Sequence, residues 1–140
     1  MKIIHGTCIE LDGKALLIQG RSNSGKSTLG LRLIALGGKL IADDRTKIFV
    51  KSNKVFVSAP ETLPLAIEAR GIGILNAPVC LEAPLAVVAN LSRTETTRLP
   101  DQARKKINIL GYSFPFYYLR GMIDPAAVLY VVLKFGVAKL

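Results

Sequence analysis

The chain has 140 residues, of which 50% are hydrophobic, and it carries a formal net charge of +9. This hydrophobic content excludes a disordered chain, and no apolar run reaches the ~18 residues that a membrane-spanning helix needs. The cations are spread along the sequence and the aromatic residues cluster away from them. The charge therefore argues against a nucleic-acid-binding protein and favours an anionic nucleotide or an acidic protein as partner. The length predicts one domain, residues 1–140.

The cysteines and the amino-terminal sequence predict the compartment. Cys8 and Cys80 lie in apolar, strand-like stretches and lack the CxxC spacing of a metal or redox site. We interpret them as reduced core cysteines. Since the first residues also lack the pattern of a signal peptide, we expect a cytoplasmic protein without a membrane partner.

The first two predicted strands form a hairpin. Residues 3–11 and 14–19 are predicted to be strands, and Asp12-Gly13 between them is a strong signal for a two-residue turn. The strand that leads into the next segment is therefore expected to pair antiparallel with the strand before it.

A glycine-rich loop follows this hairpin and matches G-x-x-x-x-G-K-[ST] at every position, from Gly20 to Ser27. Residues 28–36 then show helical periodicity, which ends at Gly37-Gly38. In such a loop, backbone N–H groups and the helix N-terminus bind phosphate oxygens, Lys26 reaches the outer phosphates and the Ser27 hydroxyl holds Mg²⁺. A Gly/Ser turn that merely caps a helix fits the strand–loop–helix context less well. We predict a nucleotide-phosphate site at Gly20, Arg21, Ser22, Asn23, Ser24, Gly25, Lys26, Ser27 and Thr28.

The rest of the chain predicts one mixed α/β domain. The expected elements are a strand at 39–42, a hairpin of 47–51 and 54–58 turning at Ser52-Asn53, short strands and tight loops over 59–84, a strand at 85–91, a surface loop at 93–103, a strand at 107–110, an aromatic strand or loop at 112–119, and a buried terminal helix at 126–135 opened by Asp124-Pro125.

Asp43-Asp44 follows the strand at 39–42, which should bring both carboxylates to the edge of the sheet where the glycine-rich loop lies. One aspartate can bind Mg²⁺ and the other can take a proton from an attacking hydroxyl, as phosphoryl transfer to an alcohol requires. A solvated Asp-Asp turn is the alternative, and the loop upstream favours the functional interpretation.

Two further stretches are ambiguous from the residues alone. His5 is the only histidine; it is either a polar surface residue or a catalytic group near the loop, if its strand runs beside the loop strand. In residues 67–75, Glu68 and Arg70 stand beside two glycines in an apolar segment, either as a structural ion pair or as part of a site.

These motifs together resemble a known family. His5-Gly6, the loop Gly20 to Ser27, the strand ending in Asp43-Asp44, and Glu68-Ala69-Arg70-Gly71-Ile72-Gly73-Ile74 are similar, in order and approximate spacing, to the catalytic domain of HPr kinase/phosphorylase. Thr97-Arg98-Leu99-Pro100 resembles the arginine-containing loop that follows in that family. The resemblance covers nearly the whole chain.

The resemblance implies an enzyme that transfers phosphate from ATP to a serine of the phosphocarrier protein HPr. In the reverse direction, inorganic phosphate attacks the phosphoserine and pyrophosphate leaves. The implied fold is a phosphoenolpyruvate-carboxykinase-like α/β domain with a mixed, largely antiparallel sheet, and members assemble as hexamers. The implied roles are the following: Asp44 as base and acid, His5 beside it, Lys26 on the phosphates, Arg98 in phosphorolysis, Ser27, Asp43 and Glu68 at Mg²⁺, and Glu68, Arg70, Gly71 and Gly73 as the family signature.

The chain departs from the family pattern at several points. Thr28 replaces a glutamate next to the metal, Asn23 replaces a glycine, and the additional amino-terminal domain of full-length members is absent, as in short forms. The chain also stops at Leu140, before the helices with which long members dock HPr. Two alternatives therefore stay open: a small-metabolite kinase, which would share every residue except the signature, and a nucleotide-binding regulatory module without turnover.

Overall fold

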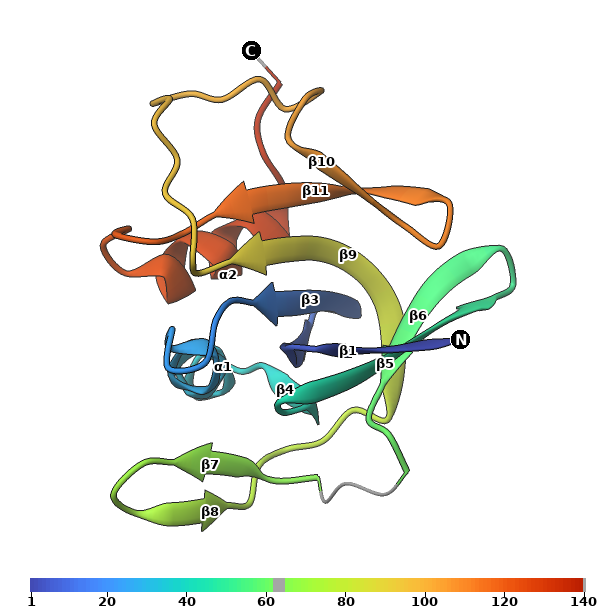
Figure 1. The fold of residues 1–140 in the computed structure, drawn as a ribbon, viewed down its shortest axis with the longest axis vertical. Coiled ribbons are helices and arrows are strands. Elements are labelled where there is room, and N and C mark those ends of the chain that lie inside the picture. Colours follow the sequence, from blue (N-terminus) through green and yellow to red (C-terminus); the bar gives the residue numbers. More distant parts are fainter. Residues whose placement is uncertain (62–64, 140) are drawn as a thin grey trace.

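The computed structural model describes residues 1–61 and 65–139 (Figure 1). Residues 62–64, within the predicted region of short strands at 59–84, and Leu140 lie outside the described residues. In chain order the elements are β1 (Lys2–His5), β2 (Thr7–Leu11), β3 (Lys14–Gln19), α1 (Lys26–Ala35), β4 (Lys39–Ala42), β5 (Arg45–Lys51), β6 (Lys54–Ser58), β7 (Ile67–Ala69), β8 (Gly73–Leu75), β9 (Glu82–Asn90), β10 (Lys106–Ile109), β11 (Tyr112–Tyr118) and α2 (Pro125–Phe135).

Most strands join one curled, mostly antiparallel sheet in the order β1-β5-β6-β9-β3-β2-β4. Strand β9 connects its two halves: its first residues pair antiparallel with β6, and the rest of the strand pairs parallel with β3 and β11 (Figure 1). The predicted α/β class with a mixed, largely antiparallel sheet is confirmed. The strand that enters the glycine-rich loop lies between β2, which is antiparallel to it, and β9.

Both predicted hairpins are present because their turn residues adopt the backbone that a two-residue turn requires. Asp12 and Gly13 have φ of 57° and 79°, and Ser52 and Asn53 have φ of 52° and 59°. Positive φ at both central residues is the geometry of a type I′ turn, which matches the twist of the flanking strands. The predicted strand at 107–110 pairs with the predicted aromatic strand or loop at 112–119, which forms the second strand of the hairpin β10–β11.

The prediction of one continuous strand over 3–11 is wrong, because the chain breaks at Gly6. A Cβ at this position would lie 2.9 Å from the carbonyl oxygen of Ile18 and 2.9 Å from Leu17 Cδ1. The Gly6 N–H donates to the carbonyl of Asp44, the residue before β5, at 2.9 Å. Residues before the break pair with β5, and residues after it pair with β3 and β4.

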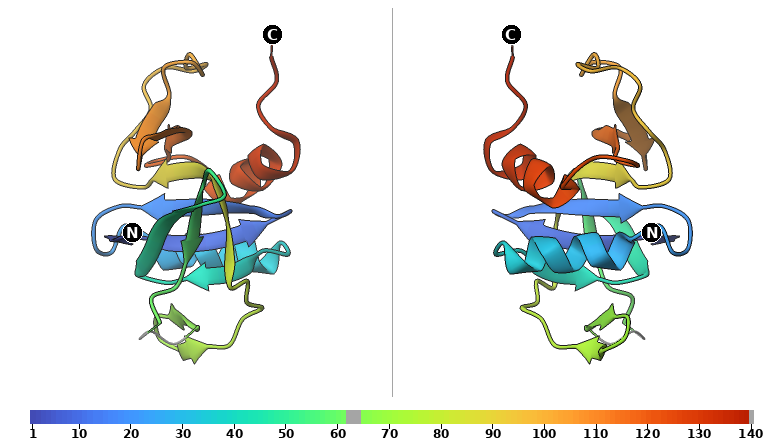
Figure 2. Two further views of the ribbon diagram at one scale, coloured as in Figure 1. Left: turned by 90° about the vertical axis from the view of Figure 1, so that its right-hand side faces the viewer. Right: turned by 90° about the vertical axis from the view of Figure 1, so that its left-hand side faces the viewer.

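The two helices cover one face of the sheet (Figure 2). Leu16 and Ile18 of β3 pack toward them, whereas Leu17 packs into a second apolar cluster on the other face. Burial on both faces keeps the loop strand rigid. Neither helix in the described ranges is long and apolar enough to cross a membrane.

Two burial predictions need correction. Helix α2 is not buried all round: Leu129 and Leu133 are buried, but Val131 is 51% and Phe135 80% exposed. Cys8 is a buried core residue, whereas Cys80 is only partly buried and does not lie in a strand. Both thiols are free, as predicted.

Candidate active site

The glycine-rich loop connects β3 with α1, and its two glycines are required by its shape. A Cβ on Gly20 would collide with the Ser24 hydroxyl, and Gly25, which caps the helix, has φ of 100°. Lys26 begins α1 and folds back over the loop, where its Nζ donates to the carbonyls of Gly20 (3.0 Å) and Arg21 (2.9 Å). Within the described residues no side chain caps the first turn of α1, so its N–H groups are available to an anion.

Asp43 joins three elements around the loop. Its Oδ1 accepts hydrogen bonds from Ser27 Oγ of α1 at 2.8 Å and from Thr7 Oγ1 of β2 at 2.9 Å. Its Oδ2 accepts a longer bond, 3.4 Å, from the backbone N–H of Glu68 in β7. Thr7 is fully buried, and no sequence motif marks a threonine at that position as part of a site.

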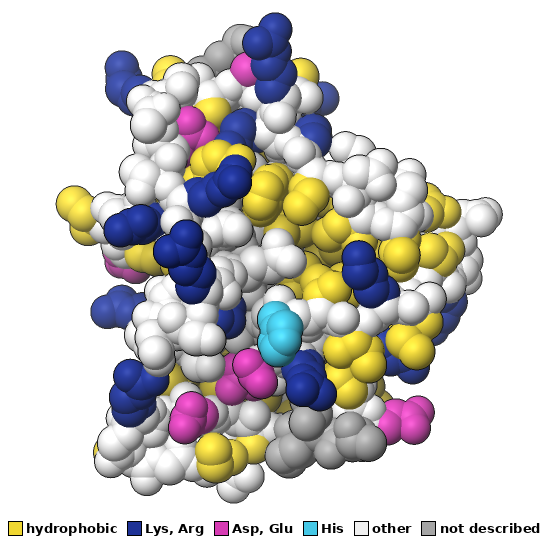
Figure 3. Space-filling view, in the orientation of Figure 1, with side chains coloured by type: hydrophobic (Ala, Val, Ile, Leu, Met, Phe, Trp, Pro, Cys, Tyr) yellow, Lys and Arg dark blue, Asp and Glu magenta, His cyan; other side chains and the backbone are white. Residues whose placement is uncertain are grey.

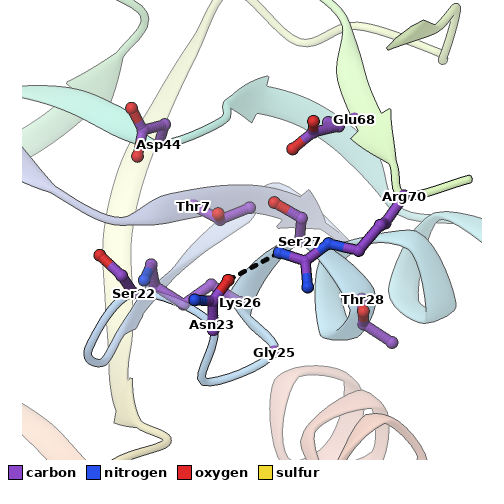
Figure 4. A pocket seen from close by; sticks show the side chains of 10 residues that line it. All are labelled: Thr7, Ser22, Asn23, Gly25, Lys26, Ser27, Thr28, Asp44, Glu68 and Arg70. Atoms are coloured by element: carbon purple, nitrogen blue, oxygen red, sulfur yellow. Dashed lines mark hydrogen bonds between the residues drawn. The ribbon is translucent and has the colours of Figure 1, made fainter. Parts of the chain in front are cut away.

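Asp44 has different surroundings from its neighbour. It is exposed, and within the described ranges no side-chain or backbone donor reaches its carboxylate, although its backbone carbonyl accepts the Gly6 N–H. Its φ is 69°, a left-handed conformation that Asp tolerates better than most residues. The turn directs its side chain to the cavity beside the loop, opposite Lys26 and Asn23 (Figure 4).

The signature segment forms the separate hairpin β7–β8, which carries Glu68 and Arg70 to the same cavity. Glu68 and Arg70 form no ion pair with each other; Arg70 Nη2 instead donates to Asn23 Oδ1 of the glycine-rich loop at 2.6 Å (Figure 4). The structure therefore contradicts the alternative in which Glu68 and Arg70 form a structural ion pair. Gly71, with φ of 90°, permits the turn of the hairpin.

These residues surround a polar cavity of about 320 Å³, near the lower end of the ~300–1,000 Å³ range typical of ligand pockets. It is lined by Thr7, Ser22, Asn23, Gly25, Lys26, Ser27, Thr28, Asp44, Glu68 and Arg70. We call it the phosphate-loop cavity. Most of the predicted nucleotide-site residues border it, and Asp43 supports it from behind through Ser27 and Thr7.

Two predicted catalytic residues lie outside this cavity. His5, at the end of β1, borders a second polar cavity of about 430 Å³ with Arg21, Ser92 and Arg93. Arg98 borders a third, more apolar cavity of about 330 Å³ between the loop after β9 and helix α2. The structure therefore does not bring His5 or Arg98 into the phosphate-loop cavity.

The loop that carries Arg98 is held in place by Glu95. The carboxylate of Glu95 accepts the Thr97 N–H at 3.1 Å and lies 3.1 Å from Lys105 Nζ. The hydrogen bond from Thr97, followed by the contact with Lys105, lowers the pKa of Glu95 below its ordinary value. Arg98 itself is exposed.

The donors around Ser27 fit a magnesium ion. Among residues 1–61 and 65–139, no three His, Cys, Asp or Glu side chains come together as a complete metal cage. Mg²⁺ in phosphate-transfer sites does not need one, since it keeps several waters and takes one or two protein oxygens besides the phosphates. The Ser27 hydroxyl and the Asp43 carboxylate are adjacent hard oxygen donors, and Glu68 borders the same cavity.

Sequence comparison matches this chain to one family. The model of the HPr Serine kinase C-terminal domain matches residues 1–115. The HPr kinase/phosphorylase of Streptococcus mutans is 42% identical over 74 residues, which are 52% of this chain and 24% of that protein. The HPr kinase/phosphorylase of Lactobacillus johnsonii is 45% identical over 76 residues, which are 54% of this chain and 24% of that protein. The matched segment thus spans about a quarter of the length of these relatives.

The fold is also similar to a solved structure, that of the Hpr(Ser) kinase/phosphatase from Coxiella burnetii. The TM-score is 0.79 over 96% of this chain and 89% of that chain, at 24% sequence identity. At this identity the likeness establishes the fold alone, which is that of the matched kinase/phosphatase structure.

Proposed function

Because this chain belongs to the HPr serine kinase C-terminal domain family, we propose that it is an ATP-dependent kinase for a serine of an HPr-like phosphocarrier protein. We propose that it also catalyses the reverse reaction by phosphorolysis. The observation that carries the proposal is the pair of aspartates. Asp43 accepts a hydrogen bond from Ser27 of the phosphate loop at 2.8 Å, and Asp44 borders the same cavity with a carboxylate that accepts no hydrogen bond from residues 1–61 and 65–139.

Nucleotide binding, in this proposal, uses the loop and α1. Lys26 exchanges the carbonyls of Gly20 and Arg21 for the outer phosphates, and the N–H groups of the first helical turn bind the phosphate oxygens. Ser27 and Asp43, with Glu68 nearby, hold Mg²⁺, which neutralises charge on the phosphates. Thr7 keeps the Asp43 carboxylate in position through its hydrogen bond of 2.9 Å.

Asp44 accepts the proton in the forward reaction and donates it in the reverse reaction. In the forward reaction it takes the proton of the serine hydroxyl while the serine oxygen attacks the γ-phosphorus, and the bond to ADP breaks. In the reverse reaction an oxygen of inorganic phosphate attacks the phosphoserine phosphorus, and the bond to the serine oxygen breaks. Asp44 returns the proton to that oxygen, and the product is pyrophosphate.

The remaining roles extend the family resemblance. We assign His5 to the side of Asp44 from which serine approaches, since the Gly6 N–H bonds the Asp44 carbonyl. Arg98 serves phosphorolysis, which requires its loop to move or another copy of the chain to supply it. Residues 1–140 act as one catalytic unit in the cytoplasm, and the copies assemble as a hexamer.

The test is transfer of label from γ-labelled ATP, with Mg²⁺, to purified HPr from the same organism, followed by mass spectrometry of the labelled residue. We expect label on a serine, and its release as pyrophosphate once inorganic phosphate is added. Arg98→Ala should impair this release more than the forward transfer. Bound ATP without label on HPr would contradict the kinase proposal, and equal losses in both directions would remove the phosphorolysis role of Arg98.

A further inference from the structure

The second polar cavity, which contains His5, has a fixed floor. Gln19 and Asn90 are register partners at the ends of the parallel strands β3 and β9. Beyond them, Leu91 N–H donates to the Gln19 carbonyl at 2.9 Å, Ser92 N–H to Asn90 Oδ1 at 2.8 Å, and Arg21 N–H to Ser92 Oγ at 2.7 Å. Ligands of α/β sheets bind at this carboxyl edge of parallel strands.

The cavity has a one-sided charge. It is lined by His5, Gln19, Gly20, Arg21, Asn90, Ser92 and Arg93, so that it contains two arginines and no carboxylate. Within the described part of the chain, neither Arg21 nor Arg93 forms an ion pair. Arg93 is oriented by Tyr118, whose hydroxyl accepts from Nη1 at 3.3 Å and whose ring lies 5.6 Å from the guanidinium carbon. An oriented guanidinium such as that of Arg93, without an acid partner among the described residues, matches phosphate and carboxylate groups.

This cavity is distinct from the phosphate-loop cavity but lies next to it. The two cavities share no lining residue, and Gly20 and Arg21, which border the second, begin the loop that continues into the first. His5 pairs with Arg45, the residue after Asp44. In Figure 3 the histidine (cyan) lies at the surface with carboxylates (magenta) directly beside it and Lys and Arg side chains around it. A protein that docks on this face therefore lies over or beside the cavity.

We propose that the second cavity is an oxyanion subsite, in which Arg21 and Arg93 bind a phosphate or carboxylate group carried by the protein substrate. The part of this inference that concerns the substrate rests on the proposed kinase function. The subsite orients the partner over Asp44 and contributes specificity rather than chemistry, because it does not contact the transferred phosphoryl group.

The first experiment does not depend on kinase activity. Inorganic phosphate is titrated into protein that is saturated with Mg²⁺ and a non-hydrolysable ATP analogue, so that the phosphate-loop cavity is occupied. The resonances of the Arg93 guanidinium and the His5 ring are followed by NMR. We expect saturable shifts of both resonances. In Arg93→Ala, the affinity for phosphate measured at the His5 signal should be about tenfold or more weaker, as the loss of a charge-assisted hydrogen-bonding partner predicts. Lys54→Ala, which removes an exposed cation at the distant β5–β6 turn, should behave as wild type.

The second experiment assigns the source of the oxyanion. With HPr as substrate, Arg93→Ala should raise KM for HPr about tenfold and leave KM for ATP and kcat nearly unchanged, with Lys54→Ala again as control. Absence of saturable shifts at His5 and Arg93 would overturn the oxyanion site, whether or not the kinase proposal holds. Phosphate binding with an unchanged KM for HPr would overturn the assignment to the protein substrate and identify free phosphate as the ligand.

Discussion

Asp43 and Asp44 are neighbours in the chain, yet in the part of the chain that the structure describes only the Asp43 carboxylate accepts hydrogen bonds. Asp43 accepts bonds from Ser27, Thr7 and the Glu68 N–H, which fix both oxygens as a metal ligand requires. The Asp44 carboxylate borders the cavity and accepts no hydrogen bond from the described residues, which suits the proton acceptor that we propose. The residues predicted the pair and its two kinds of role, and the family resemblance assigned the base to Asp44; that assignment stays a prediction.

The two proposed roles predict different effects for the substitution of each aspartate by asparagine. Asp44→Asn should lower the transfer rate about 10²–10⁴-fold, the usual contribution of a general base, while the affinity for ATP stays close to wild type. Asp43→Asn should weaken ATP binding in the presence of Mg²⁺ and have little effect in the presence of EDTA. Calorimetric titration of ATP under both conditions, together with the transfer assay, measures both effects. If Asp43→Asn lowered the transfer rate and Asp44→Asn weakened Mg²⁺-dependent ATP binding, the proposed roles of the two aspartates would have to be exchanged.

Cys8 gives the fold a pH dependence above the neutral range. Complete burial, and secondarily the nearby Cys80, raises the pKa of the Cys8 thiol far above its ordinary value of 9.0. Above pH 9 the unfolded chain loses this proton and the folded chain keeps it. The unfolded state then binds fewer protons, so the free energy of unfolding falls as pH rises, by up to ~1.4 kcal/mol per pH unit.

We therefore expect urea denaturation between pH 8 and pH 10.5 to show a steeper loss of stability for wild type than for Cys8→Ala. The variant should be less stable than wild type at pH 8, because it leaves a small cavity, and the difference should narrow as pH rises. Parallel curves for the two proteins would show that Cys8 ionises alike in the folded and unfolded states.

At the scale of elements, the features that the sequence predicted are those with local causes. The turns at Asp12-Gly13 and Ser52-Asn53 need positive φ, which these residues adopt readily, and the glycine-rich loop has a motif of fixed spacing. The break at Gly6 has no such local cause. It depends on the close approach of the Ile18 carbonyl, which exists only once β2 and β3 are paired.

The same distinction explains which parts of the site were missed. Strand β9 joins β6, β3 and β11, and these non-local pairings bring Asn90 and Ser92 beside Arg21, where no motif indicated a cavity. Likewise, the sequence marked Glu68 and Arg70 as unusual but left open whether they bind each other. Only the placement of the β7–β8 hairpin against the glycine-rich loop decides this question, in favour of the contact between Arg70 and Asn23.

The β7–β8 hairpin pairs with no strand of the large sheet in the described ranges, and this isolation makes its contacts with the loop measurable. We expect Arg70→Ala to speed amide hydrogen exchange in residues 67–75 about fivefold, as the loss of one hydrogen bond worth about 1 kcal/mol predicts. ATP binding should also weaken, because a cation leaves the phosphate-loop cavity.

Asn23→Ala is the matched control for Arg70→Ala. It removes the same hydrogen bond of 2.6 Å but leaves the guanidinium of Arg70 at the cavity where we propose that the phosphates bind. Exchange in the hairpin should rise to a similar extent, whereas the affinity for ATP should fall less. If neither substitution changes hydrogen exchange, the hairpin is held by Ile67, which is fully buried, and not by the bond to the loop.

At the scale of the whole molecule, the charge of the chain acts on its partner before any specific contact forms. With 19 Lys and Arg against 10 Asp and Glu, the molecule attracts an acidic protein over distances comparable to the Debye length, ~10 Å at 0.1 M salt. The face in Figure 3 carries many of these cations around the histidine, so that the attraction leads toward the side of the molecule where we expect the substrate to dock.

Salt should therefore weaken the encounter with the protein substrate and not the chemical step. Between 50 and 300 mM NaCl, we expect kcat/KM for an acidic phosphocarrier to fall about tenfold, with kcat nearly constant, as electrostatically steered association predicts. A short uncharged peptide that contains the acceptor serine is the control, because its kcat/KM should change much less over the same range. Stopped-flow binding would locate the effect in the association rate. A kcat/KM for the phosphocarrier that does not respond to salt would mean that the excess of cations plays no part in recognition, and that the partner is selected by contacts at the site alone.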